Sequence, residues 1–222
     1  MTTSPGPLPP PILAADPLLA RLVDELAARH GCHTVVLYGS RALGTATADS
    51  DYDLLGVCAE GEATRDARLV EGFFLDAFLY PEKVLAEVGP KLLQLRGGVV
   101  LREERGIGAR LLETVNAALA APPEALPEAE ARVRRVWCQK MLERIRRGGP
   151  EDVEAHYRRT WLLTDVLELF FQLRGRHYLG PKESFRWLAE NDPEAHRAFA
   201  DALVPGAPVD AIERLVTLVL RA

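Results

Sequence analysis

The segment that most constrains this chain of 222 residues is 37–55, LYGSRALGTATADSDYDLL. An apolar run containing Val35 and Val36 leads into it and stops at Gly39, which predicts a buried strand ending at a tight turn. We expect Ser40 to begin a short helix after that turn. Its hydroxyl and the exposed backbone N–H groups there suit a phosphate.

Two acids, Asp51 and Asp53, open the next apolar run. Side chains of an extended strand alternate with a period of two, so both carboxylates should point to the same face. Like charges so placed repel each other unless a cation lies between them, and Mg²⁺ takes carboxylate oxygens while keeping positions open for substrate phosphates. The segment therefore predicts phosphoryl or nucleotidyl transfer; the simpler alternative is a Gly- and Asp-rich hairpin.

The pattern G-S-x-x-x-G followed by D-x-D resembles the signature of the nucleotidyltransferase superfamily, which has the polymerase-β-like fold. The residues at the signature positions are Gly39, Ser40, Gly44, Ser50, Asp51 and Asp53. The family also has a third carboxylate on a later strand. Here Asp76 is the one acid in the apolar run FFLDAFLY, residues 73–80, where an unpaired charge would be costly. The alternative for Asp76 is the solvated end of a strand.

The resemblance implies a catalytic site with two Mg²⁺ ions and a nucleoside triphosphate as substrate. Asp51 and Asp53 would bridge both ions, and Asp76 would hold the ion nearer the acceptor. The β- and γ-phosphates would lie on the Gly39–Ser40 turn, with Ser50 also in the nucleotide site.

Two neighbours of these residues are open to simpler interpretations. Arg41 adds a charge beside the phosphates, although an exposed helix arginine has the same pattern. Tyr52 alternates with the two acids and is expected in the core.

Composition limits the partners. The formal net charge of −5 argues against a long nucleic acid, which needs a basic surface. No apolar run approaches the length of a membrane span. The N-terminus lacks the pattern of a secretory signal, and three widely spaced cysteines indicate reduced thiols, so we expect a cytoplasmic protein.

The predicted fold class is α+β, a small mixed sheet with packed helices followed by an all-α bundle. We expect a disordered Pro-rich arm over 1–15, a nucleotidyltransferase domain over 16–120, a linker over 121–128 and a helical bundle over 129–222. The strands predicted for the first domain are 34–38, 52–58, 70–79 and 99–102. Its predicted helices are 18–29, 81–88, 91–95 and 107–119. The helices predicted for the bundle are 129–146, 153–173, 184–190, 194–203 and 209–220.

A minimal nucleotidyltransferase domain followed by helices also resembles the aminoglycoside nucleotidyltransferases, in which the helical domain forms one wall of the cleft. That resemblance implies ATP as donor, a small and cationic acceptor, and a role in antibiotic resistance. One helical stripe would offer the acceptor an aromatic ring, two acids and an amide: Trp161, Asp165, Glu168 and Gln172.

Two residues of the helical half are candidates for the site itself. Glu168 is the candidate general base, and its alternative is a solvated helix face. Lys182 follows a Gly-Pro break from which it would reach the triphosphate, and its alternative is a surface lysine.

Two other function classes stay open. One is a protein- or RNA-modifying nucleotidyltransferase of toxin–antitoxin type, with the partner encoded separately. The other is a non-catalytic nucleotide-binding protein, although such proteins usually lose one of the three acids. The sequence leaves the acceptor open and fits either a monomer or a homodimer.

Overall fold

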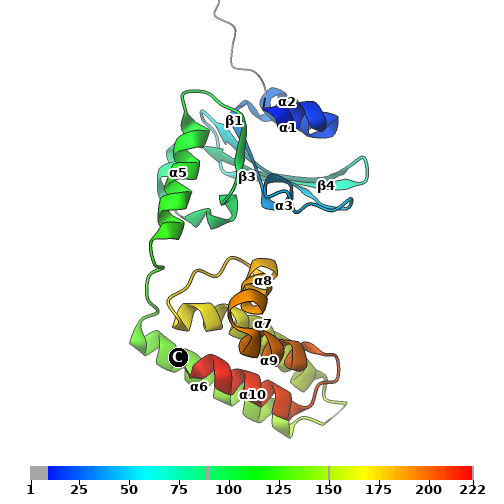
Figure 1. The fold of residues 1–222 in the computed structure, drawn as a ribbon, viewed down its shortest axis with the longest axis vertical. Helices are drawn as coiled ribbons and strands as arrows, with labels where there is room; N and C mark the ends of the chain where they lie inside the picture. The colour runs from blue at the N-terminus through cyan, green and yellow to red at the C-terminus, as the bar shows by residue number, and fades with distance from the viewer. Residues whose placement is uncertain (1–9, 89–90, 150, 222) are drawn as a thin grey trace, which may run out of the picture. The chain divides into compact units, whose positions relative to one another are not determined.

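The computed structural model describes residues 10–88, 91–149 and 151–221, which fall into two compact units, Met1–Ala121 and Pro122–Ala222. In Figure 1 the first unit runs from blue to green and contains every strand of the described chain. The second runs from green to red and is helical. This confirms the predicted α+β class.

The first unit is built on a mixed five-stranded sheet in the order β3-β4-β2-β1-β5. Its strands are β1 (Cys32–Tyr38), β2 (Tyr52–Cys58), β3 (Thr64–Val70), β4 (Phe73–Pro81) and β5 (Val99–Arg102). Strand β1 is buried along its whole length. Strands β2 and β4 pair in parallel, whereas the other neighbours are antiparallel.

Each face of the sheet has its own apolar core. Helix α2 (Pro17–His30) covers one face with a buried stripe that includes Leu19, Leu22 and Leu26, as expected from its apolar spacing. Helix α5 (Ile107–Ala120) and the 3₁₀ turn η2 (Leu93–Leu95) pack on the other face. Residues in β1 and β2 that face α5, such as Val36 and Leu55, are fully or almost fully buried.

The strand predicted over 70–79 is wrong as a single element, because it runs across a turn between two strands. Glu71 and Gly72 both have positive φ, 51° and 89°, and form the turn of the β3–β4 hairpin. Strand β3, TRDARLV, was not predicted. It lies at the edge of the sheet and most of its side chains are exposed, so it lacks the apolar content of a buried strand.

Two shorter segments also differ from the prediction. Residues Pro11–Ala15, expected within the disordered arm, form helix α1, while 1–9 lie outside the described residues. The helix expected over 91–95 is reduced to η2, preceded by helix α4 (Glu82–Val88). Helix α3 (Gly39–Ala42) follows β1 directly, where a short helix was expected.

The second unit consists of helices around one core. They are α6 (Glu128–Arg147), α7 (Val153–Leu173), α8 (Pro181–Asn191), α9 (Pro193–Leu203) and α10 (Val209–Leu220). Phe170 and Phe199, both fully buried, meet edge to face at the centre of this core. Across the part of the chain that the structure describes, no helix combines the length and apolarity needed to span a bilayer.

Candidate functional site

Two of the predicted acids, Asp53 and Asp76, lie at neighbouring positions at one end of the sheet, and Asp51 directly precedes β2. Asp53 lies opposite Asp76 in the parallel β2–β4 pair and opposite Tyr38 in the antiparallel β1–β2 pair. Paired positions on neighbouring strands point to the same face, so these three side chains form a row on the face that α5 covers further along. The neighbouring acids also act on the phenol. Burial raises the pKa of Tyr38, and the charges of Asp53 and Asp76 raise it further.

Gly39 allows the Asp53 carboxylate to lie against the turn. A Cβ at position 39 would fall 2.2 Å from Asp53 Oδ2 and 3.0 Å from its Cγ. The backbone there has φ +71°, a conformation that side-chain-bearing residues rarely adopt. Position 39 therefore requires glycine for two reasons: the backbone conformation of the turn and the space that the Asp53 carboxylate occupies.

Arg41 holds the loop that carries Asp51. Its guanidinium donates to the Asp51 carbonyl oxygen at 3.1 Å and to the Ser50 carbonyl oxygen at 2.7 Å. It also stacks on the Tyr52 ring, 3.8 Å from the centroid, and lies 3.8 Å from Asp16. Arg41 thus holds the backbone at the start of β2, and its predicted role beside the phosphates stays a prediction. Tyr52 is buried, as predicted.

The two serines predicted for the nucleotide site, Ser40 and Ser50, form different hydrogen bonds. Ser50 Oγ accepts a hydrogen bond from the Thr47 backbone N–H at 2.8 Å, so its hydroxyl closes the turn before Asp51. Ser40 is half-buried in α3, and its carbonyl oxygen accepts from Thr45 N–H at 2.9 Å. Asp51 itself is exposed.

Asp76 is engaged by Arg65, a residue that the sequence did not single out. Arg65 Nε and a terminal nitrogen each donate to one Asp76 oxygen at 2.6 Å, which is the bidentate arrangement of strong arginine–carboxylate pairs. The same guanidinium lies over the Phe78 ring, 4.8 Å from its centroid. Hydrogen bonding to Asp76 also raises the pKa of Arg65.

The donor atoms of Asp53 and Asp76 are of the type that binds a divalent cation. Asp53 and Asp76 supply oxygens from adjacent positions, which is the donor chemistry that Mg²⁺ prefers. Within the described ranges, however, no three His, Cys, Asp or Glu side chains converge closely enough to hold a metal ion. One physical reason is the pairing of Asp76 with Arg65, because both oxygens of the Asp76 carboxylate already accept hydrogen bonds from that arginine.

Comparison with known proteins identifies a family that part of this chain matches. Residues 19–94 match the family described as nucleotidyltransferase domain. The chain carries a nucleotidyltransferase domain. No curated protein matches it. One solved structure, a nucleotidyltransferase-like protein from Exiguobacterium sibiricum, aligns at a TM-score of 0.41 and 14% identity, over 91% of this chain and 72% of that chain.

The matched nucleotidyltransferase domain spans β1 to β4, and so includes Gly39, Asp51, Asp53, Asp76 and Arg65. Two residues that lie beside the acids, Tyr38 and Arg65, were not predicted as site residues. Tyr38 could have been considered, because it directly precedes Gly39 in the sequence. Arg65 had no comparable local signal, because its pairing depends on the hairpin register that sets β3 beside β4.

The remaining predicted residues belong to the helical unit, outside the matched nucleotidyltransferase domain. Glu168 is exposed on α7 and accepts a hydrogen bond from Gln172 Nε2 at 2.8 Å. Asp165, on the same stripe, is paired with Arg134 of α6 at 3.1 Å. Lys182 is exposed in the first turn of α8. Their roles toward an acceptor or a triphosphate stay predictions.

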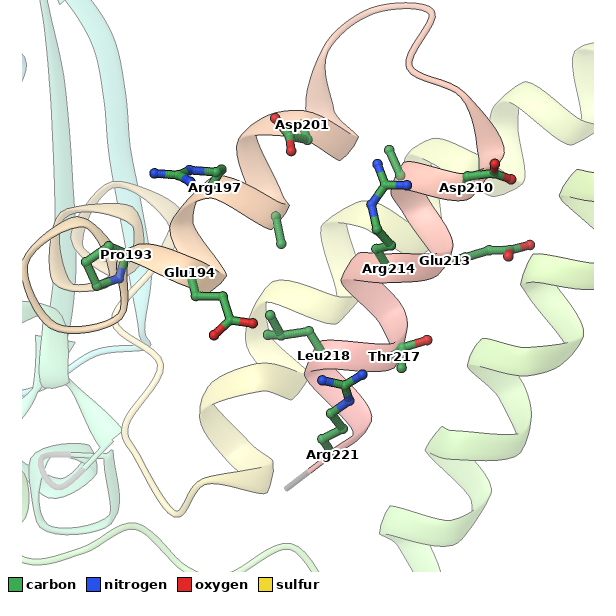
Figure 2. Close-up of a pocket in the computed structure, with 12 residues that line it drawn as sticks. Pro193, Glu194, Arg197, Asp201, Asp210, Glu213, Arg214, Thr217, Leu218 and Arg221 are labelled. Carbon is green, nitrogen blue, oxygen red and sulfur yellow. The ribbon is translucent and has the colours of Figure 1, made fainter.

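A groove of about 660 Å³ lies between α9 and α10, and Figure 2 shows the residues that line it. Charges of both signs alternate along it, with Arg197 and Arg214 beside Asp201 and Asp210. None of its lining residues was predicted to act in the nucleotidyltransferase reaction.

Proposed function

We propose that this protein transfers a nucleoside monophosphate from a nucleoside triphosphate, ATP in our prediction, to an acceptor hydroxyl. The observation that carries the proposal is the placement of Asp53 opposite Asp76, beside the Gly39 turn, inside a nucleotidyltransferase domain. General nucleotidyl transfer follows from the domain. The nucleotide, the metal and the acceptor are part of the proposal.

In this reaction the acceptor oxygen forms a bond to the α-phosphorus, and the bond from that phosphorus to the bridging oxygen breaks. Pyrophosphate leaves with the electron pair, and the hydroxyl proton passes to a base, for which Glu168 is our candidate. Negative charge accumulates on the phosphoryl oxygens and the leaving group. Two bound Mg²⁺ ions would supply the positive charge that stabilises them, held by Asp51, Asp53 and Asp76.

The chain's own residues prepare this site in two ways. Arg41 fixes the backbone of Ser50 and Asp51, so the acids enter β2 in a set orientation. Gly39 leaves room for the Asp53 carboxylate and, in the proposal, for the β- and γ-phosphates beside Ser40. The Arg65 guanidinium would compete with a metal ion for the Asp76 oxygens.

The Arg65–Asp76 pair also favours a second candidate, a non-catalytic nucleotide-binding protein. If Arg65 stays on Asp76 when nucleotide binds, its positive charge would weaken metal binding at that carboxylate. Nucleotide binding without turnover is the signature of this alternative.

The acceptor site is predicted on helix α7. We predicted a cationic acceptor on the stripe of Trp161, Asp165, Glu168 and Gln172. The Asp165 charge is partly neutralised by Arg134, and Glu168 is bonded to Gln172, which weakens the pull on a cation. A small hydroxyl compound such as an aminoglycoside stays a prediction.

The deciding experiment measures transfer of labelled nucleotide to a panel of acceptors in the presence of Mg²⁺. Asp51→Asn and Asp53→Asn should each lower turnover by about 100-fold or more, because the amide cannot replace the carboxylate charge. Asp49→Asn is the matched control, since Asp49 is an exposed acid in the same loop. Full activity in both Asn variants would show that the acids are not the site.

Binding separates the two candidates. A catalytic site should show Mg²⁺-dependent stabilisation by nucleotide that Asp53→Asn removes, together with turnover. Stabilisation by nucleotide with no transfer to any acceptor would favour the non-catalytic alternative.

A further inference from the structure

A pocket of about 340 Å³ lies between α6 and α7, inside the helical unit. Three aromatic rings line it. Trp161 meets Trp137 edge to face with centroids 5.5 Å apart, and the Tyr157 ring lies 6.4 Å from Trp161. Trp161 and Tyr157 are 51% and 68% exposed, although aromatic rings are usually buried when they serve only packing.

The same pocket is strongly basic. Lys140, Arg144 and Arg158 line it, whereas Glu154 is its one acid and is already paired with Arg158. Within residues 10–88, 91–149 and 151–221, neither Lys140 nor Arg144 forms an ion pair, so their charges are available to a ligand. The surplus continues along α6, which carries seven basic and three acidic residues.

Exposed rings beside unpaired cations point to a ligand that is both flat and anionic. Bases stack on aromatic side chains, and the phosphates that follow them are neutralised by Lys and Arg. A duplex hides its bases, and an acidic peptide offers no π-face to Trp161. Single-stranded nucleic acid meets both requirements.

We propose that this α6–α7 pocket binds single-stranded nucleic acid, with a base stacked on Trp161 and Tyr157 and phosphates at Lys140 and Arg144. The proposal goes beyond nucleotidyl transfer. It shares Trp161 with the stripe predicted for the acceptor, but the pocket contains none of the acids proposed to hold metal. It also revises the expectation drawn from the net charge of −5. Binding depends on the local charge of a surface rather than on the total.

The test is fluorescence titration of the full-length protein with a labelled, unstructured RNA or DNA strand of about 12 nucleotides, within the usual site sizes. Trp161→Ala should weaken binding by about 5- to 100-fold, the range expected for one lost base stack. Trp161→Phe should keep most of the affinity. The double variant Lys140→Gln/Arg144→Gln should lower the salt slope by about 1.4, because each phosphate contact contributes about 0.7.

Matched controls are available on the same scaffold. Arg132→Gln removes an exposed charge of α6 outside the pocket, and Phe74→Ala removes an aromatic ring that is 63% exposed on β4. Both should bind the strand as the unaltered protein does. Asp53→Asn should also bind normally, so loss of transfer and loss of strand binding can be told apart. If Trp161→Ala fails to fold, Tyr157→Ala and Trp161→Phe carry the test.

Several outcomes would overturn the proposal. Unchanged affinity in the Trp161 and Lys140/Arg144 variants would exclude this pocket. Equal affinity for a duplex or for an acidic peptide would reduce it to a non-specific basic surface. Equal affinity for a mononucleotide and the strand would replace strand binding with a small-nucleotide site.

Discussion

Replacing Gly39 with alanine tests how the turn and the acid depend on each other. The new Cβ would lie 2.2 Å from Asp53 Oδ2 and 3.3 Å from Asp53 Cβ, so turning the carboxylate away relieves only part of the overlap. The positive φ costs about 1–2 kcal/mol for a residue with a side chain. Forcing atoms into occupied space adds about 1–3 kcal/mol. We therefore expect Gly39→Ala to lower the free energy of unfolding by about 2–5 kcal/mol.

Gly44 provides the control. Its φ of +68° nearly equals the +71° of Gly39, but a Cβ at position 44 would meet no atom within 4 Å. Gly44→Ala should therefore show the backbone cost alone, and the difference between the two variants isolates the contact with Asp53. The assay is urea unfolding of both variants, followed by circular dichroism.

A double-mutant cycle measures how strongly the effect of Gly39→Ala depends on the Asp53 carboxylate. In an Asp53→Ala background the overlapping oxygen and Cγ are gone, so Gly39→Ala should cost little more than Gly44→Ala. Equal costs for Gly39→Ala and Gly44→Ala in the unaltered protein would refute the close approach. So would a Gly39→Ala cost that is the same with and without the Asp53 carboxylate.

Two further predictions concern charges near the same end of the sheet. Arg65→Gln should free the Asp76 oxygens and increase the affinity for Mn²⁺ or Mg²⁺ measured by calorimetry. The control Arg102→Gln, which changes an exposed arginine of β5, should leave that affinity unchanged. Unchanged affinity in Arg65→Gln would mean that Arg65 does not compete with the metal ion. Burial, with a hydrogen bond to Asp16, raises the pKa of Tyr52 to about 12, against about 10 in an unfolded chain. Because the pKa is higher in the folded state, the contribution of Tyr52 to the free energy of unfolding is complete below about pH 10. It is lost as the pH rises through 12. Tyr52→Phe should make stability less dependent on pH in that window, and an unchanged profile in urea melts would contradict this origin.

The parts of the site that were predicted are those that depend on short spacing. The Gly39 turn and the start of β2 at Tyr52 lie within one strand–turn–strand segment, so local patterns sufficed to predict them; Asp51 lies directly before β2. Asp76 was found because an acid stands out in an apolar strand. Its position opposite Asp53 needed the sheet order, which the sequence did not provide.

The missed parts depend on an edge strand. Arg65, Asp66 and Arg68 make β3 look like a polar loop, because an edge strand exposes most of its side chains. Without β3, the partner of Asp76 could not be recognised. Arg41 and Ser50 also form hydrogen bonds within the local loop that the sequence did not indicate, and their predicted places in the nucleotide site stay predictions.

The sheet order also has a consequence for synthesis on the ribosome. Strand β1 lies between β2 and β5, and β5 is the last strand of the sheet in the chain. Until residues 99–102 have emerged, one edge of β1, a strand that is buried along its whole length in the folded unit, therefore stays unpaired. Such edges promote association between chains, and distant pairings form slowly. The helical unit emerges later and relies more on local contacts, so we expect the sheet to limit the folding yield.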